Sequence, residues 1–536
     1  MRARIGLMQV MEGIMSRERS AAVIAFMVLA FGALNLRADV KLPRLISDGM
    51  VLQQGMKVNI WGTADPSEDV TVTLQDQRAN GITDGTGHWQ LKLGPFNPGG
   101  PYTLTISGKN TLVLHDVLVG EVWVCSGQSN MEMPVGPSSG GWSSGVLNYQ
   151  DEIARADYPT LRMFTVQHAV ADKPQTDVQG SWVPAHGDAI ANFSATAYFF
   201  GRDLQKALNV PVGLIHSSWG GTRAEAWTSR GTLESDPEFK SILEDRAKLL
   251  STYPRIFQDY EQQLAQWRRE SDKAEADGAV VPPPPNVPKD PRSDSARPSG
   301  LFNGMVMPLT PFTIRGVIWY QGESNSDRPI QYRKLFPAVI RDWRQSWGEG
   351  DFPFLYVQLA NWGVHTLKYD WAKLREAQSM ALALPKTGMA VTIDIGDGSN
   401  IHPQNKQEVG YRLALAAQGI AYRRDVIYSG PAYESMTVEG AAIRLHFQHS
   451  DGGLTAKSLS IINVSGFEIA GEDRKFVGAD AKIDGIAVVV SSGEVVHPVA
   501  VRYAWGMNPR PSIYNRAGLP ASPFRTDRWD DLPPEW

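Results

Sequence analysis

The spacing of hydrophobic and polar residues divides the chain into three regions, of which the first spans residues 39 to about 112. Apolar and polar residues alternate there in short runs, and turn residues such as glycine separate the runs. The clearest runs are residues 58–62, 70–74 and 102–106. A period of two is the pattern of a half-buried strand. This region therefore predicts a small antiparallel β-domain.

The middle region, residues 113 to about 425, alternates apolar strand-like runs with helical patterns. The predicted strands are 117–125, 161–166, 212–216, 314–320, 354–358 and 389–395, and the predicted helices are 194–208, 330–346 and 370–384. A further helix follows residue 402, where apolar residues recur three and four positions apart. Alternating strands and helices imply a parallel sheet covered on both faces, so we predict a doubly wound α/β domain.

Two segments do not fit that sheet. Residues 231–299 have the composition of an insertion: 235–276 are charged with a helical pattern, and four prolines at 282–285 begin a polar run that cannot build a core. The insertion can shape a cleft or lie at the periphery, and its composition favours the periphery. From about residue 426 to 536 the period-two alternation returns, which predicts a second β-domain or the remaining strands of the first.

The strand predicted at 117–125 ends in an abrupt change from apolar to small polar residues. Gly127 precedes Ser129 by two positions, which lets the backbone bend tightly and leaves the hydroxyl at the carboxyl edge of the sheet. Ligands bind at that edge in open α/β sheets, so Ser129 is a candidate nucleophile. An ordinary Ser-Asn turn is the alternative, because both residues favour turns and the second glycine of a nucleophile elbow is missing.

Two later strands also end in polar, glycine-containing turns, at residues 316–325 and 394–403. The motifs Gly-Gln-Ser-Asn-Met, Trp-Tyr-Gln-Gly-Glu-Ser-Asn and Ile-His-Pro, in this order, resemble the sialate O-acetylesterase-like group of the SGNH hydrolases, from about Leu42 to about Thr526. The resemblance implies a flavodoxin-like SGNH sheet with accessory β-sandwich or jelly-roll strands from both terminal regions. It also implies a serine esterase that removes O-acetyl groups from carbohydrates.

The base and the acid of such an esterase would come from the last of the three turns. A serine hydroxyl needs a base to take its proton, and the resemblance selects His402 from the ten histidines as general base and then general acid. Many SGNH hydrolases carry an aspartate three residues before this histidine, where this chain has Ser399. We choose Asp397 as the acid. Asp394, or a Ser-His dyad whose ring is oriented by a backbone carbonyl, stays open.

Acyl transfer also needs hydrogen-bond donors for the developing oxyanion. We expect these to be the N–H of Ser129, the backbone at Gly220 and Gly221, and the side-chain amide of Gln321. The resemblance puts an amide donor at that last position, with glutamine in place of the usual asparagine.

Four further residues are candidates for contacts with the substrate or for support of the catalytic residues. Arg223 can contact substrate or pair with a neighbouring acid. The other three are Asn130, Glu323 and Asn325.

Composition limits the classes of partner and cofactor. The formal net charge of −5 over 536 residues argues against nucleic acid or an anionic membrane surface as the main partner. The single cysteine, Cys125, excludes an intramolecular disulfide and is expected in the core. The sequence has no His-Glu-X-X-His motif, no thiolate cluster and no glycine-rich phosphate loop, so we predict neither a metal nor a cofactor.

The N-terminus has the pattern of an export signal. Arg17 and Arg19 precede an apolar run at 21–34, and Ala38 offers a small residue for cleavage. The run is short for a membrane-spanning helix, which needs about 20 residues, although a retained anchor is the alternative. We therefore expect residues 1–38 to be a signal peptide and the mature chain to be periplasmic or extracellular, with no membrane attachment after cleavage.

The leading hypothesis is an exported serine esterase that acts on O-acetylated carbohydrates and is similar to sialate O-acetylesterases. One alternative substrate is acetylated plant cell-wall polysaccharide, namely xylan, xyloglucan or pectin, which similar proteins deacetylate. An alternative of another class is a non-catalytic carbohydrate-binding protein on the same scaffold. The combination of Ser129, Gln321 and His402 favours the enzyme, because binding alone does not require it.

Overall fold

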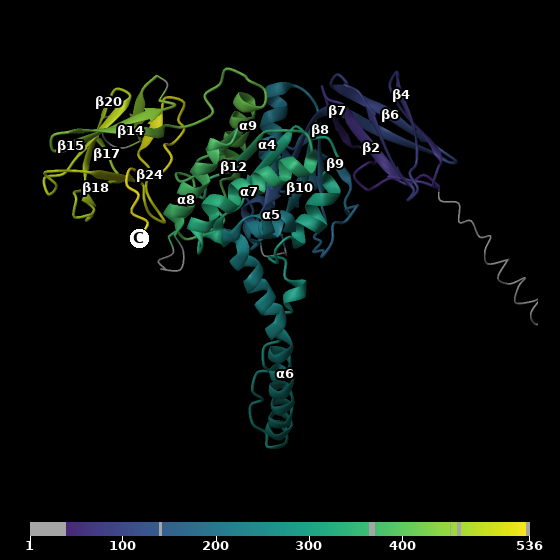
Figure 1. The fold of residues 1–536 in the computed structure, drawn as a ribbon, viewed down its shortest axis with the longest axis horizontal. Helices are drawn as coiled ribbons and strands as arrows, with labels where there is room; N and C mark the ends of the chain where they lie inside the picture. The colour runs from purple at the N-terminus through teal and green to yellow at the C-terminus, as the bar shows by residue number, and fades with distance from the viewer. Residues whose placement is uncertain (1–38, 139–141, 364–369, 451, 458–462, 532–536) are drawn as a thin grey trace, which may run out of the picture.

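The computed structural model describes residues 39–138, 142–363, 370–450, 452–457 and 463–531 (Figure 1). The signal peptide predicted at residues 1–38 lies outside the described residues. No helix within the described ranges combines the length and the apolar character that a membrane span requires. Three parts of the body lie in a row in Figure 1: the C-terminal strands, the α/β region and the N-terminal strands. A single long helix projects from the middle.

The central sheet runs in the order β13-β12-β11-β7-β10-β8-β9. Its strands are β7 (Thr111–Gly127), β8 (Asp157–Thr165), β9 (Trp182–His186), β10 (Val212–Ser218), β11 (Gly316–Tyr320), β12 (Phe354–Val357) and β13 (Thr387–Ala390). All neighbours in this order pair in parallel except β8 and β9, which are antiparallel. The mixed α/β class predicted from the sequence is confirmed, and β9 adds an antiparallel edge that the pattern did not predict.

Helices cover both faces of this sheet. They are α2 (Ser129–Glu132), α3 (Tyr149–Ala154), α4 (Ala195–Leu208), α7 (Pro329–Trp347), α8 (Trp371–Met380) and α9 (Lys406–Ile420). On one face α4 and α9 pack together, and Phe200 of α4 meets Trp123 of β7 edge-on at 5.2 Å between ring centroids. On the other face Trp343 of α7 meets Trp319 of β11 at 5.7 Å. Trp319 is in register with Ser126, an odd number of residues from Trp123, so the two tryptophans point to opposite faces.

Strand β7 is longer than its sequence pattern predicts, and it belongs to two sheets. Its first half pairs antiparallel with β6 in the N-terminal region, and its second half lies between β10 and β11. Burial follows the same division: it is mixed from Thr111 to Asp116 and complete from Val117 to Gly127. A strand with one solvent-facing side thus becomes one covered on both faces. The predicted domain boundary at residues 112–113 falls inside this continuous strand.

The N- and C-terminal regions are built from short strands. The N-terminal strands are β1 (Val51–Gln53), β2 (Val58–Thr63), β3 (Asp69–Leu74), β4 (Gln77–Ile82), β5 (His88–Leu93) and β6 (Gly99–Ser107). The C-terminal strands are β14 (Ala432–Glu439), β15 (Ala442–Gln448), β16 (Leu454–Ala456), β17 (Asn463–Val464), β18 (Phe467–Ala470), β19 (Val477–Gly478), β20 (Asp480–Asp484), β21 (Ala487–Ser491), β22 (Ala500–Tyr503), β23 (Ile513–Asn515) and β24 (Phe524–Arg525). All C-terminal pairs are antiparallel.

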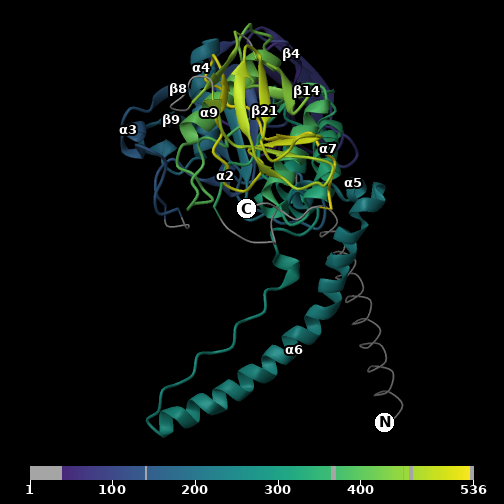
Figure 2. The ribbon, with the colours of Figure 1, turned by 90° about the vertical axis from the view of Figure 1, so that its left-hand side faces the viewer.

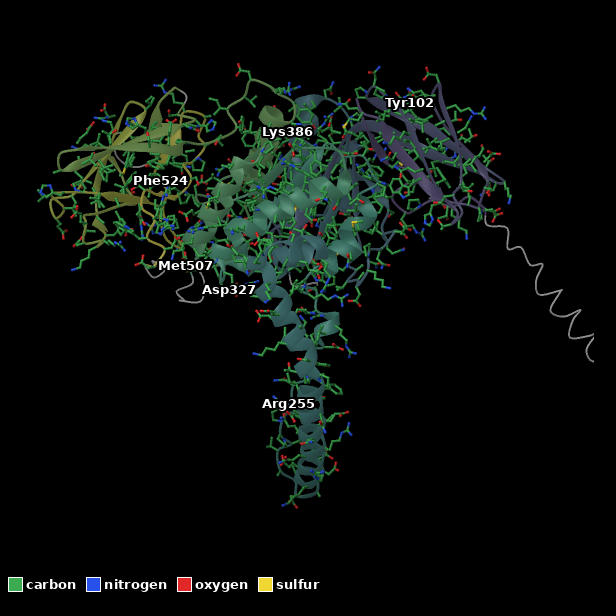
Figure 3. All side chains as sticks on the ribbon, viewed as in Figure 1. Tyr102, Arg255, Asp327, Lys386, Met507 and Phe524 are labelled. Carbon is green, nitrogen blue, oxygen red and sulfur yellow. The ribbon has the colours of Figure 1, made fainter. Side chains whose placement is uncertain are left out.

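The segment predicted as an insertion forms a stalk. After the short α5 (Arg230–Ser235), helix α6 (Lys240–Ala276) runs for 37 residues away from the body, and the chain returns alongside it (Figure 2). The Nε1 of Trp267 donates to the carbonyl of Pro282 at 2.7 Å, which attaches the proline-rich return segment to the helix. Figure 3 shows Arg255 partway along this stalk, well below Asp327 at the edge of the body.

Candidate active site

The candidate nucleophile lies where β7 ends. Gly127 has a φ of +139°, and a Cβ at this position would lie 2.1 Å from the carbonyl oxygen of Tyr320, so only glycine fits. The N–H of Gln128 donates to the same carbonyl at 2.9 Å, and the chain then turns into α2, whose first residue is Ser129. Close packing of β7 on β11 thus fixes the point at which the serine leaves the sheet, at its carboxyl edge.

His402 lies directly against that serine. The hydroxyl of Ser129 is 2.9 Å from Nε2 of His402, a distance for a hydrogen bond donated by the serine. Burial, and then the positive charge of Lys406, lower the pKa of His402 from its ordinary 6.5 to about 4, while Glu132 acts in the opposite direction. The imidazole is therefore neutral at neutral pH and can accept the proton. Trp142 packs edge-on against the imidazole with 4.9 Å between ring centroids.

The structure does not bring the predicted acid to His402. Asp397 is exposed, and its Oδ1 accepts hydrogen bonds from the N–H and the hydroxyl of Ser399 at 2.8 and 2.7 Å, which lower the pKa of its carboxyl. The alternative, Asp394, pairs with both terminal nitrogens of Arg412 at 2.6 and 2.9 Å. Within the part of the chain that the structure describes, Nδ1 of His402 makes no hydrogen bond.

The expected oxyanion donors divide into two groups. The backbone N–H groups of Ser129 and Gly221 have no acceptor among the described residues, and both residues line the pocket. The N–H of Gly220 is already engaged, since it donates to Oε2 of Glu132 at 2.6 Å. The other oxygen of Glu132 lies 3.1 Å from Nε2 of His168. In this geometry Ser129 and Gly221 are the free donors, and Gly220 supports the turn.

Gln321 lies beneath the pocket rather than in it. Its Nε2 donates to Oδ1 of Asn325 at 2.7 Å and to the carbonyl of Thr222 at 3.3 Å, and its Oε1 accepts from the hydroxyl of Tyr332 at 2.9 Å. The side chain is fully buried and does not line the pocket. Both amide hydrogens are therefore used within the protein, so the expectation that Gln321 is an oxyanion donor is not met in this geometry.

The remaining predicted residues take up different positions. Arg223 lines the pocket and also forms a two-fold ion pair with Asp327 at 3.0 and 2.9 Å, so it pairs with a neighbouring acid, and its contact with substrate stays a prediction. Asn325 accepts from the N–H of Ala224 at 2.9 Å and is buried away from the pocket. Asn130 and Glu323 are buried side by side, with 2.6 Å between Nδ2 and Oε1.

The pocket above these residues has a volume of about 580 Å³, in the range of small-molecule sites. Trp142 and Trp362 are partly exposed and contribute apolar ring surface, the nearly buried Trp371 also lines the pocket, and serine, histidine and carboxylate groups converge there. Its described lining is Gln128, Ser129, Glu132, Trp142, Gly220, Gly221, Arg223, Glu323, Ser324, Trp362, Trp371, Ile401 and His402. Flat rings combined with a few polar groups suit the apolar faces and hydroxyl edges of a sugar. None of these residues comes from the 231–299 insertion.

Sequence reasoning missed several residues of this site, among them Glu132, Lys406 and Trp142. Glu132 follows Ser129 by three positions within α2, so helical spacing could have selected it, whereas His402 lies outside α9 and spacing does not connect it to Lys406. Trp142 lies in an irregular segment between α2 and α3, where neither periodicity nor a motif marks it.

The chain is similar to known carbohydrate esterases. The family model for carbohydrate esterases of the sialic acid-specific acetylesterase type matches residues 300–419. Sialate O-acetylesterase of Mus musculus is 34% identical over 429 residues, which span 72% of this chain and 74% of that protein. The Homo sapiens sialate O-acetylesterase is 30% identical over 531 residues, which span 89% of this chain and 91% of the human protein.

A solved structure is also similar along nearly the whole chain. The crystal structure of a novel carbohydrate acetylesterase from Xanthomonas citri superposes with a TM-score of 0.76 at 36% identity, covering 92% of this chain and 100% of that one. With the match to the curated relatives over most of their length, the chain belongs to the sialate O-acetylesterase family of carbohydrate esterases and is a carboxylic ester hydrolase.

Proposed function

We propose that this chain hydrolyses O-acetyl esters on carbohydrates with Ser129 as nucleophile and His402 as general base and acid. The observation that supports the proposal most is the 2.9 Å contact between the serine hydroxyl and Nε2 of His402 at the wall of a tryptophan-lined pocket. A non-catalytic binding protein has no need of a serine placed against a neutral histidine.

In the proposed reaction His402 accepts the proton of Ser129 while the serine oxygen attacks the acetyl carbonyl carbon. The N–H groups of Ser129 and Gly221 donate to the oxygen that becomes negative. The tetrahedral intermediate collapses, the bond to the sugar oxygen breaks, and His402 returns its proton to that oxygen. Water, deprotonated by His402, then attacks the acetylated serine, and acetate and free Ser129 are released.

For the substrate we propose O-acetylated sialic acids, because the mouse and human relatives are sialate O-acetylesterases. The tryptophans at the pocket offer surfaces for a sugar ring, and the volume accommodates one or two residues of a glycan. Acetylated plant polysaccharide is the competing substrate, and the same pocket features would serve it. A direct comparison of substrates decides between the two.

We also propose that the mature protein is exported. The support is the pattern of Arg17, Arg19, the apolar run at 21–34 and Ala38. N-terminal sequencing of the protein from the periplasm and from the medium tests this. A mature terminus at or near residue 39 supports export, and an intact N-terminus in the cytoplasmic fraction contradicts it.

The experiment for the activity is acetate release from a panel of O-acetylated sialosides, acetylated xylan, xyloglucan and pectin, with 4-nitrophenyl acetate as a small reference ester. We expect turnover of the reference ester and preferential release from the sialosides. Ser129→Ala is the matched negative control. Acetate release from a plant polysaccharide alone would support the esterase activity and contradict the proposed sialoside substrate. Equal rates for the parent and Ser129→Ala on every ester would contradict the proposed function.

A further inference from the structure

His402 is held through its backbone on both sides. The side chain of Asn130 donates from Nδ2 to the carbonyl oxygen of Ile401 at 3.0 Å. The ammonium group of Lys406 donates to the carbonyl oxygen of Pro403 at 2.6 Å. The carbonyl of Ile401 belongs to the peptide unit just before His402, and that of Pro403 belongs to the second peptide unit after it, so the two side chains hold the backbone on either side of the residue that carries the imidazole.

The two side chains also bind each other. Nζ of Lys406 donates to Oδ1 of Asn130 at 2.7 Å, so Asn130 uses its amide oxygen for the lysine and its amide nitrogen for the loop. The backbone carbonyl of Asn130 accepts from the hydroxyl of Thr196 at 3.0 Å. Because Asn130 follows Ser129 directly in α2, one rigid unit carries the nucleophile and the residue that holds the base.

The position of Lys406 is energetically unfavourable for a cation. Its side chain is fully buried, and an ammonium group is desolvated at large cost unless it is paired and hydrogen-bonded. Its surroundings supply two oxygen acceptors and the face of Tyr320, whose ring centroid lies 5.7 Å from Nζ. The carboxyl of Glu323 lies on the far side of Asn130, with 2.6 Å from Oε1 to Nδ2. Hydrophobic residues would fill this space at lower cost, which points to a function for the cation.

We propose that Asn130 and Lys406 are positioning residues that hold His402 against Ser129 through its two flanking carbonyls, and so perform the orienting role that an acid at Nδ1 performs in a Ser-His-Asp triad. The inference rests on the proposed function of Ser129 and His402. It explains how the imidazole keeps its orientation although Asp397 and Asp394 bind elsewhere. When the backbone is fixed on both sides, the imidazole can move only by rotation about its own two side-chain torsions. Trp142 packs against the imidazole and restricts this rotation.

The lysine also acts on His402 through its charge. The proposal therefore predicts a change in the pH dependence of the activity that a packing role alone would not produce. The charged groups that act on the imidazole are Lys406 from α9, which lowers its pKa, and Glu132 from α2, which raises it; burial is the largest cause of the low value. In the acidic range Lys406 is protonated, because its own pKa is about 7. Removing its charge therefore raises the pKa of His402, and the acid limb of the activity moves to higher pH.

The test measures kcat and KM for 4-nitrophenyl acetate from pH 3.5 to 8 in the full chain with Lys406→Met, Asn130→Ala and both together. A shift of about 1 Å in a reacting group costs about 10²-fold, so we expect each single change to lower kcat by about 10- to 100-fold with KM nearly constant. The acid limb moves up in Lys406→Met. The double variant loses less than the product of the two single losses, because both residues hold one loop.

Lys373→Met is the matched control. Lys373 is another nearly buried lysine that donates to a backbone carbonyl, that of Asp530 at 3.2 Å, and it does not line the pocket. Circular dichroism and thermal melting of each variant separate a local effect from a loss of fold, and Ser129→Ala shows whether the parent turnover belongs to the proposed site.

Each result bears on either the positioning role of Asn130 and Lys406 or the proposed function. A folded Lys406→Met with the kcat and the acid limb of the parent would overturn the proposal, as would a kcat loss equal to that of Lys373→Met. If Lys406→Met does not fold, Asn130→Ala decides by the same criteria of kcat and KM. If the parent itself does not hydrolyse the ester, or Ser129→Ala hydrolyses it equally well, the proposed function fails instead.

Discussion

The neighbouring strands β7 and β11 end in almost the same four residues, yet only one end holds the candidate nucleophile. Gly127-Gln128-Ser129-Asn130 begins at the last residue of β7, and Gly322-Glu323-Ser324-Asn325 begins two residues after the end of β11. Both glycines have positive φ, and both serines line the same pocket. The difference is the partner: the hydroxyl of Ser129 lies 2.9 Å from Nε2 of His402, while the hydroxyl of Ser324 makes no hydrogen bond with the described residues.

The position of the glycine explains which side chains reach the pocket. At each end the serine comes two residues after the glycine, where the chain has already turned out of the sheet. Gln321 comes one residue before its glycine, directly after the last residue of β11, and its side chain stays below the pocket among Tyr332, Thr222 and Asn325. A polar residue at a strand end is therefore a candidate ligand only when it lies beyond the bend.

The largest expected effect is the loss of activity in Ser129→Ala. Removing the nucleophile should lower kcat by about 10³-fold or more, because the serine and its base act as a unit. Ser324→Ala is the matched change at the sister turn, and we expect a far smaller loss because no base faces that hydroxyl. Turnover of 4-nitrophenyl acetate with both variants measures the contrast. Similar losses in the two would show that the two strand ends are not functionally different.

The second prediction concerns the base that distinguishes the two ends. His402→Ala should cost about as much as Ser129→Ala, because the imidazole moves protons in both halves of the reaction. In the parent the base must be neutral, and its pKa is held near 4 by burial and by Lys406, so activity persists well below pH 6.5 and falls only as pH approaches 4. The measurement is kcat/KM from pH 3.5 to 8. An acid limb at pH 6 to 7 would contradict the buried, neutral imidazole.

The third and smaller effect is that of Gln321→Ala. Truncation leaves Asn325, Tyr332 and the carbonyl of Thr222 without their partner, and each unsatisfied buried group costs about 1–3 kcal/mol of the free energy of unfolding. We expect kcat to fall by less than the roughly 10²- to 10³-fold loss typical of a missing oxyanion donor. Denaturant unfolding and kcat are measured together.

Tyr332→Phe is the control for Gln321→Ala, since it removes the bonds of the tyrosine hydroxyl to Oε1 and to the backbone carbonyl of Gln321 and leaves the amide in place. A loss of kcat of about 10²-fold in a Gln321→Ala variant that is as stable as the parent would support Gln321 as an oxyanion donor.

The sequence predicts the features that depend on local pattern. Apolar runs locate the central strands to within a few residues, and the glycine before Ser129 marks the turn from which that residue reaches the pocket. Features that depend on distant partners are not predictable in this way. Whether the amide of Gln321 is free depends on Tyr332, and the length of β7 depends on its pairing with β6.

The same limit explains why the residues that hold His402 were not predicted. In the sequence, Lys406 is an ordinary lysine in the first turn of a predicted helix, and such a lysine side chain is usually exposed to solvent. Its burial follows from the tertiary packing that places the start of α9 beside Tyr320, the last residue of β11, and beside Asn130. A motif reports that residues occur together, but it does not report which hydrogen-bonding groups are already satisfied.

The smallest expected effect is that of Asp397→Asn. The carboxyl accepts two hydrogen bonds from Ser399, and an asparagine oxygen can accept the same pair, so the turn is retained. The bonds to Ser399 lower the pKa of Asp397, so the residue is ionised throughout the active range and its loss removes only an exposed charge. We expect kcat within about twofold of the parent, as for most surface changes. The measurement is kcat across pH beside Ser399→Ala, which removes the hydroxyl partner and leaves the acid. An Asp397→Asn variant as inactive as Ser129→Ala would mean that the loop rearranges during the reaction to complete a triad, and would remove the reason for assigning the orientation of His402 to Asn130 and Lys406.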